Sequence, residues 1–324
     1  MSQAIQFATT GDSEVLRLTR LAETRPPPGT VRIRQRWAGV NFIDVYHRTG
    51  RYPVAALPAV PGVEAAGVVD AVGENVSEVV PGQRVAWAGA TLGGYSQSAI
   101  VPAERVLALP PHVSEQTAAG ALMRGLTVHM LLHRVRAVTA GDTLLVHAAA
   151  GGLGLVLTQW VVRLGARVIA VVGDDAKAAV AERAGAKHVI VRRREDFVDA
   201  VHRIAPEGVD VVYDGVGGST LLRSLECVRP FGLVVSLGEA SGSLPDITLT
   251  DLGRRSIAIA RPSVVAYTRD VASYRAGAAA LFDLLKHGLA VTIGTTFPLA
   301  AAARAQRALE SGATSGSILL DLTD

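Results

Sequence analysis

The stretch LLVHAAAGGLGLVLTQ, residues 144–159, decides the fold, because an apolar strand runs there into a turn of small residues that opens a helix. Small residues at the end of a strand let main-chain N–H groups approach an anion, and the helix directs its positive end at the same place. In the G-x-G-x-x-G pattern of dinucleotide-binding turns, alanine replaces the first glycine here. The stretch predicts a pyrophosphate cradle made of Ala149, Gly151, Gly152, Leu153 and Gly154.

The sequence around this turn supports the interpretation. Residues 155–164 are helix-forming and stop at Gly165, which is typical of a helix C-terminal cap, and a second apolar strand follows at once. From about residue 124 to 262, apolar strands alternate with helical stretches, as in a doubly wound parallel sheet. The strands predicted there are 143–148, 167–172, 188–191, 209–213, 232–237 and 256–260.

The chain has a different character on either side of this segment. Before residue 120, prolines and glycines punctuate short Val- and Ile-rich segments, which is typical of a β-rich domain. After residue 268, a long helix to His287, a short strand, another helix and a final strand at 317–322 are expected, and the last strand is expected to rejoin the first domain. We therefore predict an α/β protein with a β-rich domain, 1–123 and 265–324, and an inserted parallel-sheet domain, 124–264.

Composition limits the kind of protein. The chain has 324 residues, enough for two domains, and its apolar residues are mostly Ala, Val and Leu interrupted by charges. No apolar run approaches the roughly 18 to 20 residues of a spanning helix, and the N-terminus lacks the features of a signal peptide, so we expect a cytoplasmic enzyme and no membrane partner. One cysteine, Cys227, excludes an internal disulfide and a cysteine-built metal site. The net charge of +3 is mild and the arginines are mostly scattered, so no nucleic acid partner is expected.

Several motifs in a fixed order carry a family resemblance over almost the whole chain. They are GVNFIDVYHRTGRY at 39–52, PGVEAAGVVDAVGENV at 61–76, VHAAAGGLGLVLTQ at 146–159 and FGLVVSLGEASG at 231–242. Together they resemble the zinc-independent, zeta-crystallin-like quinone oxidoreductases of the medium-chain dehydrogenase/reductase superfamily. The resemblance implies a GroES-like catalytic domain and a Rossmann domain that binds NADPH.

The resemblance also indicates that no metal is bound. Where zinc-dependent members of the superfamily carry Gly-His-Glu, this chain has Gly62-Val63-Glu64, and Asn41 takes the position of their cysteine ligand. Valine cannot ligate a metal, and an asparagine amide is a poor zinc ligand. His129 and His133 have helical i, i+4 spacing, but no third ligand stands near them in the sequence.

The end of the second strand of the parallel sheet bears on the choice of cofactor, because NAD-dependent Rossmann proteins carry an acidic residue there. This chain has Val172, with Asp174 and Asp175 displaced beyond it. Lys177 matches the lysine with which relatives bind the 2′-phosphate, and Arg192 stands where relatives often carry tyrosine. Arginine binds a phosphate through paired, charge-assisted hydrogen bonds, so we predict NADPH.

Further cofactor-binding residues follow from the resemblance alone. One departure from the family pattern is Gly312, which stands where relatives carry an arginine. The other positions expected to face the cofactor are Thr127, Gly173, Leu237, Gly238, Arg261 and Pro262.

The catalytic residues implied by the resemblance are Asn41, Asp44, Tyr46 and Tyr52. The tyrosines would orient or protonate an acceptor oxygen, and Asn41 would hydrogen-bond the nicotinamide side. We predict NADPH-dependent reduction of a quinone or related conjugated carbonyl by direct hydride transfer. Two alternatives stay open: an enoyl-thioester or enone reductase of the same superfamily, and a non-catalytic NADPH- or RNA-binding protein like the crystallins. The strand at 256–260 is expected at a sheet edge, and the resemblance implies a homodimer.

Overall fold

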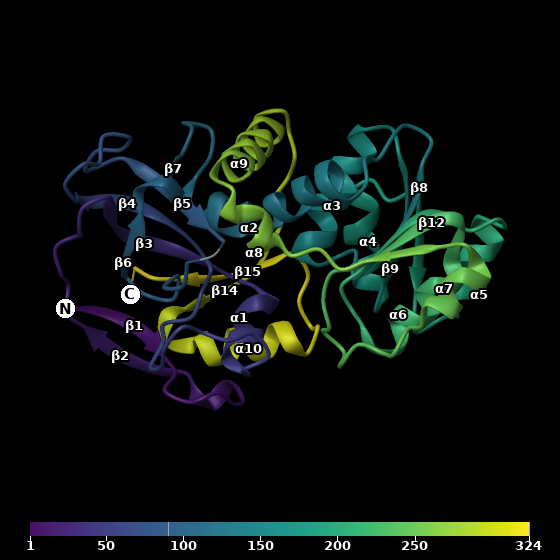
Figure 1. Cartoon of the computed structure of the whole chain (residues 1–324), viewed down its shortest axis with the longest axis horizontal. Helices are drawn as coiled ribbons and strands as arrows, with labels where there is room; N and C mark the ends of the chain where they lie inside the picture. Colours follow the sequence, from purple (N-terminus) through teal and green to yellow (C-terminus); the bar gives the residue numbers. More distant parts are fainter. Residues whose placement is uncertain (90, 324) are drawn as a thin grey trace. The chain divides into compact units, whose positions relative to one another are not determined.

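The computed structural model describes residues 1–89 and 91–323. The chain forms two compact units, whose elements are labelled in Figure 1. Unit 1 consists of residues 1–127 and 264–324, and unit 2 consists of residues 128–263. The two segments of unit 1 are therefore separated in the sequence by the whole of unit 2.

Unit 2 is built on a six-stranded parallel sheet with the strand order β10-β9-β8-β11-β12-β13. The strands are β8 (Thr143–His147), β9 (Arg167–Val172), β10 (His188–Val191), β11 (Val209–Asp214), β12 (Val228–Ser236) and β13 (Ala258–Ala260). The helices are α3 (Gly152–Arg163), α4 (Asp175–Arg183), α5 (Phe197–Ile204), α6 (Gly218–Ser224) and α7 (Leu249–Arg255).

The central strands of this sheet are buried because helices cover both of its faces. All five residues of β8 are buried, and in β9 only Arg167 is exposed. Apolar runs without polar alternation are typical of parallel strands that pack on two sides. This packing fixes the carboxyl ends of β8, β9 and β10 beside one another, and the candidate cofactor residues follow directly from those ends.

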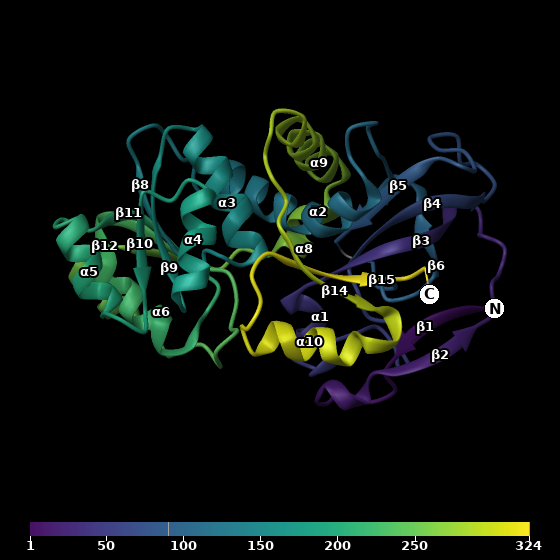
Figure 2. The ribbon, with the colours of Figure 1, turned by 180° about the vertical axis from the view of Figure 1, so that it is seen from behind.

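Unit 1 contains a seven-stranded, mostly antiparallel sheet in the order β14-β15-β3-β4-β5-β7, with β6 also paired to β3, and a separate pair, β1-β2. Its strands are β1 (Ser2–Gln6), β2 (Arg17–Leu21), β3 (Thr30–Val40), β4 (Glu64–Val72), β5 (Arg84–Ala88), β6 (Ser98–Pro102), β7 (Leu107–Ala108), β14 (Ile293–Pro298) and β15 (Ser317–Asp321). β15 lies between β14 and β3, parallel to the first and antiparallel to the second, as Figure 2 shows.

The helices of unit 1 surround this sheet. They are α1 (Phe42–Arg48), most of α2 (Glu115–Met130), α8 (Val264–Arg269), α9 (Val271–Lys286) and α10 (Ala302–Glu310). The last three residues of α2 and the π-helical turn that continues it, Leu131–Val135, belong to unit 2. The apolar core of the unit includes Trp87 and Tyr95, both fully buried. No helix in the described part of the chain is both long enough and apolar enough to cross a membrane.

The α/β fold class predicted from the sequence is confirmed, and the predicted bounds of β9 and β10 match those of the structure. The last strand pairs with β3 in unit 1, as expected. The predicted strand at 232–237 is longer than expected, Val228–Ser236, and the one at 256–260 is shorter, Ala258–Ala260. The helix α1 was not predicted, because it is only seven residues long and contains aromatic and β-branched residues, which have a weak helix propensity.

Candidate functional site

The turn after β8 has the backbone that a phosphate cradle requires. Gly154 has no room for a side chain, because a Cβ there would lie 2.7 Å from both the carbonyl oxygen of Ala148 and the Cα of Ala149. The left-handed conformation in this turn belongs to Ala148, with φ of 50°, and not to Ala149. Alanine is therefore tolerated at position 149, where the dinucleotide-binding pattern has its first glycine.

The beginning of α3 leaves hydrogen-bond donors for an anion. Gly151 is its N-cap residue, and no side chain caps the helix there. In an α-helix the first N–H groups have no partner within the helix, which at this end concerns Gly152, Leu153 and Gly154. The positive end of a 12-residue helix adds to the attraction. The residues present therefore fit a dinucleotide pyrophosphate.

Both acidic residues that follow β9 are engaged by cations. Asp174 caps α4 by accepting a hydrogen bond from the backbone N–H of Lys177 at 3.0 Å, and its carboxylate lies 3.6 Å from Nζ of the same lysine. The pKa of Asp174 is lowered chiefly by that backbone hydrogen bond. Asp175 forms an ion pair with Arg194 at 2.6 Å. Gly173, just before them, has open space where a side chain would be.

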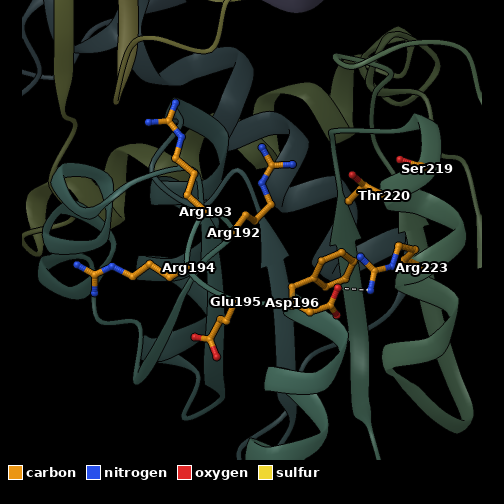
Figure 3. Close-up of a pocket in the computed structure, with 9 residues that line it drawn as sticks. Arg192, Arg193, Arg194, Glu195, Asp196, Ser219, Thr220 and Arg223 are labelled. Carbon is orange, nitrogen blue, oxygen red and sulfur yellow. Dashed lines mark hydrogen bonds and ion pairs between the residues drawn. The ribbon is translucent and has the colours of Figure 1, made fainter.

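A cavity of about 490 Å³ opens beside the end of β10. In Figure 3 Arg192 and Arg193 point the same way, whereas Arg194 points to another side. Arg194 pairs with Asp175, and Arg223 pairs with Asp196 at 2.5 Å. The lining residues are Arg192, Arg193, Arg194, Glu195, Asp196, Phe197, Ser219, Thr220 and Arg223.

Arg192 and Arg193 have no carboxylate within ion-pair distance among residues 1–89 and 91–323. Burial is the main reason why the pKa of His147 is lowered to about 4; the charge of Asp214 opposes this effect, and the positive charge of Arg192 adds to it, so this guanidinium acts at the end of β8. Arg193 similarly contributes to the lowered pKa of Asp174, after the larger effects of Lys177. The two arginines therefore place unneutralised positive charge next to the carboxyl ends of β8 and β9.

The remaining predicted cofactor residues lie in both units. Leu237 and Gly238 follow β12, and Arg261 donates a 2.9 Å hydrogen bond to Oγ of Ser236 at the end of that strand. Arg261 also forms an ion pair with Glu239, and Pro262 comes next in the chain. Thr127 belongs to α2 and donates its hydroxyl to the carbonyl of Met123 at 2.8 Å.

The structure brings Tyr46 and Tyr52 together in unit 1. Tyr46 is on α1, Tyr52 follows this helix, and their ring centroids are 5.1 Å apart. The guanidinium of Arg51 lies 5.9 Å from the centroid of Tyr46. His47, which the sequence did not single out, lies 6.2 Å from the ring of Tyr52, and burial lowers its pKa.

Asp44 is fully buried, whereas the neighbouring Tyr46 keeps 8% of its surface exposed. Its Oδ2 accepts hydrogen bonds from the backbone N–H of Asn41 at 2.9 Å and from the hydroxyl of Tyr95 at 3.0 Å. Burial raises the pKa of Asp44 to about 7, although these hydrogen bonds lower it in part. Asp44 thus holds the first turn of α1 in place.

Glu64 forms a polar network that the sequence did not reveal. Its carboxylate is fully buried, and Oε1 accepts a 2.6 Å hydrogen bond from the backbone N–H of Met123. Oε2 accepts hydrogen bonds from Nδ2 of Asn41 at 2.9 Å and from Arg124 at 3.1 Å. Gly39 makes room for this group, since a Cβ there would lie 2.2 Å from Oε2. The sequence did contain one signal for this network, an acidic residue at the otherwise apolar start of β4. A buried acidic side chain requires a partner that donates to it or carries a positive charge.

Val63 and Asn41, which the resemblance aligns with zinc-ligand positions, have other roles here. Val63 is a buried apolar residue, and the amide of Asn41 is hydrogen-bonded to Glu64. The rings of His129 and His133 lie 4.1 Å apart, and burial, together with the charge of His133, lowers the pKa of His129 to about 4. In the described part of the chain, no three His, Cys, Asp or Glu residues gather in a way that could hold a metal ion.

Comparison with known proteins identifies the family. Residues 27–111 match the model of the alcohol dehydrogenase GroES-like domain, and residues 152–282 match that of the zinc-binding dehydrogenase. The chain is 39% identical to a quinone oxidoreductase of Pseudomonas aeruginosa, over 99% of each protein. The chain belongs to the quinone oxidoreductase family.

Solved structures agree with this family. The crystal structure of the Escherichia coli quinone oxidoreductase complexed with NADPH superimposes with a TM-score of 0.95, at 38% identity, over 98% of this chain and 99% of that one. A 2-haloacrylate reductase of a Burkholderia species is 41% identical over 91% of each chain. The predicted resemblance to the quinone oxidoreductases of the medium-chain superfamily is thereby confirmed.

Proposed function

We propose that this quinone oxidoreductase family member reduces quinones with NADPH by direct hydride transfer and without a metal ion. One observation carries the proposal. Unit 2 combines the small-residue turn at the start of α3, which fits a phosphate, with Arg192 and Arg193, which have no carboxylate within ion-pair distance in the described part of the chain. The E. coli relative whose structure holds NADPH supports the same cofactor. Residues 124–264 are the proposed cofactor-binding domain, and residues 1–123 and 265–324 are the proposed catalytic domain.

NADPH, when bound, supplies a hydride. The N–H groups at the start of α3 would hold its pyrophosphate, and Arg192 with Lys177 would hold its 2′-phosphate. Thr127, Gly173, Leu237, Gly238, Arg261 and Pro262 are proposed to line the rest of the cofactor.

The acceptor is proposed to bind at Tyr46 and Tyr52. The two tyrosine rings, tilted by 57° to each other, lie beside the Arg51 guanidinium, so the region combines electron-rich aromatic faces with a positive charge. A quinone or enone delocalises the negative charge that develops during reduction, so it does not need the electrophile that an alcohol or simple ketone requires. Tyr46 and Tyr52 then orient the acceptor oxygen or deliver a proton to it, and Asp44 positions the helix that carries Tyr46.

The Burkholderia relative favours a second candidate, a reductase of conjugated carboxylic acids or thioesters. Such substrates share the conjugated carbonyl, and Arg51 beside the tyrosines would suit an anionic acceptor. A purely NADPH- or RNA-binding role is the third candidate, and it predicts tight cofactor binding without turnover of any acceptor.

The deciding experiment measures NADPH oxidation by protein treated with a chelator and then dialysed. A naphthoquinone, 2-chloroacrylate and a short enoyl thioester are offered in parallel. We expect turnover of the quinone, with the same rate before and after chelation. Turnover of only an acrylate or thioester would move the assignment to the second candidate. A loss of activity on chelation that Zn²⁺ restores would contradict metal-free catalysis.

We further propose that the protein is a cytoplasmic homodimer. β13 is an edge strand of the unit 2 sheet, and edge strands invite pairing with a second copy. Phe231, which donates its backbone N–H to Ser256 next to this strand, is 86% exposed, and Leu249 is 87% exposed. A dimer formed along β13 would cover Phe231. The single buried cysteine suits the reducing cytoplasm.

Light scattering at micromolar concentration is expected to give about twice the chain mass of 33.8 kDa. Phe231→Asp is expected to shift the protein toward the monomer, because the dimer would have to bury the new charge. Leu18→Asp is the matched control, since this leucine is 48% exposed but belongs to unit 1. A monomeric mass for the unsubstituted chain would contradict the dimer.

A further inference from the structure

Three buried polar side chains meet at the carboxyl ends of β8 and β11 in unit 2. His147 is the last residue of β8, Asp214 is the last residue of β11, and Ser224 ends α6. Ser224 and Asp214 have no exposed surface, and His147 keeps 4%. Oγ of Ser224 lies 3.0 Å from Nε2 of His147 and 3.1 Å from Oδ2 of Asp214. Almost no surface is left for a ligand, so this cluster acts through the segments that it joins.

The hydrogen bonds of the cluster run in one direction. His147 is neutral near pH 7, because burial lowers its pKa to about 4. Its Nδ1 is buried and has no hydrogen-bond partner in the described part of the chain. A buried donor without an acceptor is unfavourable, so we assign the ring proton to Nε2, which donates to Ser224. The Ser224 hydroxyl in turn donates to Asp214 and to the carbonyl of Thr220, which lies 2.8 Å away.

The cluster joins the two turns that leave the sheet where the strand order reverses. β8 and β11 are parallel neighbours, and the strands that follow them lie on opposite sides of this pair. Ala148, which follows His147, opens the phosphate cradle. Oδ1 of Asp214 holds the other turn by accepting from the N–H groups of Val216 at 2.7 Å and Gly217 at 3.0 Å. In open α/β sheets ligands bind in the crevice between such turns, so the cluster lies where the two walls of the crevice meet.

The turn after β11 leads to the arginine-lined cavity. The helix α6 follows this turn and brings Ser219 and Thr220 to the cavity, across from Arg192 (Figure 3). Ser224 ends the same helix, and the charge of Arg192 acts on His147. The cluster therefore links the cradle after β8 with the helix that forms one wall of the cavity.

We propose that Ser224 is a positioning residue that holds the phosphate cradle and the arginine-lined cavity at the separation that one NADPH molecule requires. This inference rests on the proposed use of NADPH, whose pyrophosphate and 2′-phosphate are two anionic groups on one molecule. Once the first group has bound, the second binds as an intramolecular event, and its effective concentration depends on the alignment of the two sites. Ser224 thus determines the gain from binding both groups at once, and it touches neither.

Ser224→Ala removes the hydroxyl that joins His147 to Asp214. We expect this variant to bind NADP⁺ about tenfold more weakly, because the two sites are no longer held in register. NAD⁺ lacks the 2′-phosphate, and adenosine 2′-monophosphate lacks the pyrophosphate, so each engages only one of the two sites. Their affinities are expected to change less than about twofold. A purely structural role would lower stability without distinguishing the three ligands.

Two substitutions of His147 separate the hydrogen bond from the packing. The amide Nε2 of glutamine donates as the ring Nε2 does, whereas leucine donates nothing. We expect His147→Leu to show the selective loss of NADP⁺ affinity and His147→Gln to keep most of that affinity. Thr158→Val is the matched control, because the Thr158 hydroxyl is also buried in unit 2 but has no hydrogen-bond partner among residues 1–89 and 91–323. It is expected to leave all three affinities unchanged.

Titration calorimetry with NADP⁺, NAD⁺ and adenosine 2′-monophosphate decides the proposal. The inference is overturned if Ser224→Ala binds NADP⁺ as tightly as the unsubstituted protein does, or if it loses the same factor for all three ligands. If Ser224→Ala does not fold, the His147 variants decide, and equal NADP⁺ affinities of His147→Leu and His147→Gln overturn the inference. An unsubstituted protein that binds neither NADP⁺ nor adenosine 2′-monophosphate would instead refute the proposed function, and the inference with it.

Discussion

Replacing Lys177 and Arg192 together by alanine is expected to weaken NADPH binding about 10²- to 10⁴-fold and to leave NADH binding nearly unchanged. Each charged group hydrogen-bonded to the 2′-phosphate contributes about 1.5–3 kcal/mol, and NADH lacks that phosphate. The structure further predicts an unequal division of the effect. Lys177 already has Asp174 at 3.6 Å, whereas Arg192 has no carboxylate partner in the described part of the chain, so Arg192 should account for most of the loss.

Dissociation constants of NADPH and NADH for the two single variants and the double variant test this expectation. Arg194→Ala is the matched control, because Arg194 belongs to the same arginine run but pairs with Asp175 and points away from Arg192 in Figure 3. Arg193→Ala shows whether the second unpaired arginine shares the role. Equal losses of NADPH and NADH affinity in the double variant would contradict the proposed phosphate contacts.

Arg124→Met is expected to lower the free energy of unfolding by about 3–5 kcal/mol at pH 8, because it leaves the carboxylate of Glu64 buried without its cation. The loss should become smaller as the pH falls. Burial raises the pKa of Glu64 in the folded state above its value in the unfolded chain, so the folded state takes up the proton first. Below that folded pKa the carboxyl group is neutral, and the cost of the buried charge disappears.

Urea unfolding of Arg124→Met at pH 8 and at pH 5 measures both parts of this expectation. Arg36→Met is the control, since Arg36 pairs with Glu115 at 3.5 Å but its side chain is 53% exposed. An exposed pair contributes at most about 1 kcal/mol. If the two substitutions destabilised the protein equally, or if the loss for Arg124→Met did not depend on pH, the buried pair would not have the role described.

The parts of the structure predictable from the sequence are those that depend on neighbours along the chain. Alternation of apolar strands and helices predicted the parallel sheet, and the small residues from Ala149 to Gly154 predicted the turn after β8. Tyr46 and Tyr52, by contrast, were indicated by the family resemblance, and in the structure their ring centroids lie 5.1 Å apart.

Interactions between distant positions were not predictable in this way. Glu64 meets Arg124, sixty positions away, only because β4 packs beside α2 in unit 1. Asp175 meets Arg194 because β9 and β10 are neighbours, and this pairing distinguishes Arg194 from Arg192 within one run of arginines. The sequence shows the charges, whereas their pairing depends on the packing of the strands.

The place of β15 in the sheet of unit 1 bears on how the chain folds during synthesis. Residues 37–40 of β3 pair with β15, which the ribosome produces only after the whole of unit 2. β6 pairs with residues 30–34 of β3 earlier, but until β15 is made the bonds that it forms with residues 37–40 are missing, and β14 has nothing to join it to β3. Unit 2 is a single uninterrupted segment, so its sheet is able to close on the nascent chain first, and the domain that begins the chain is completed last.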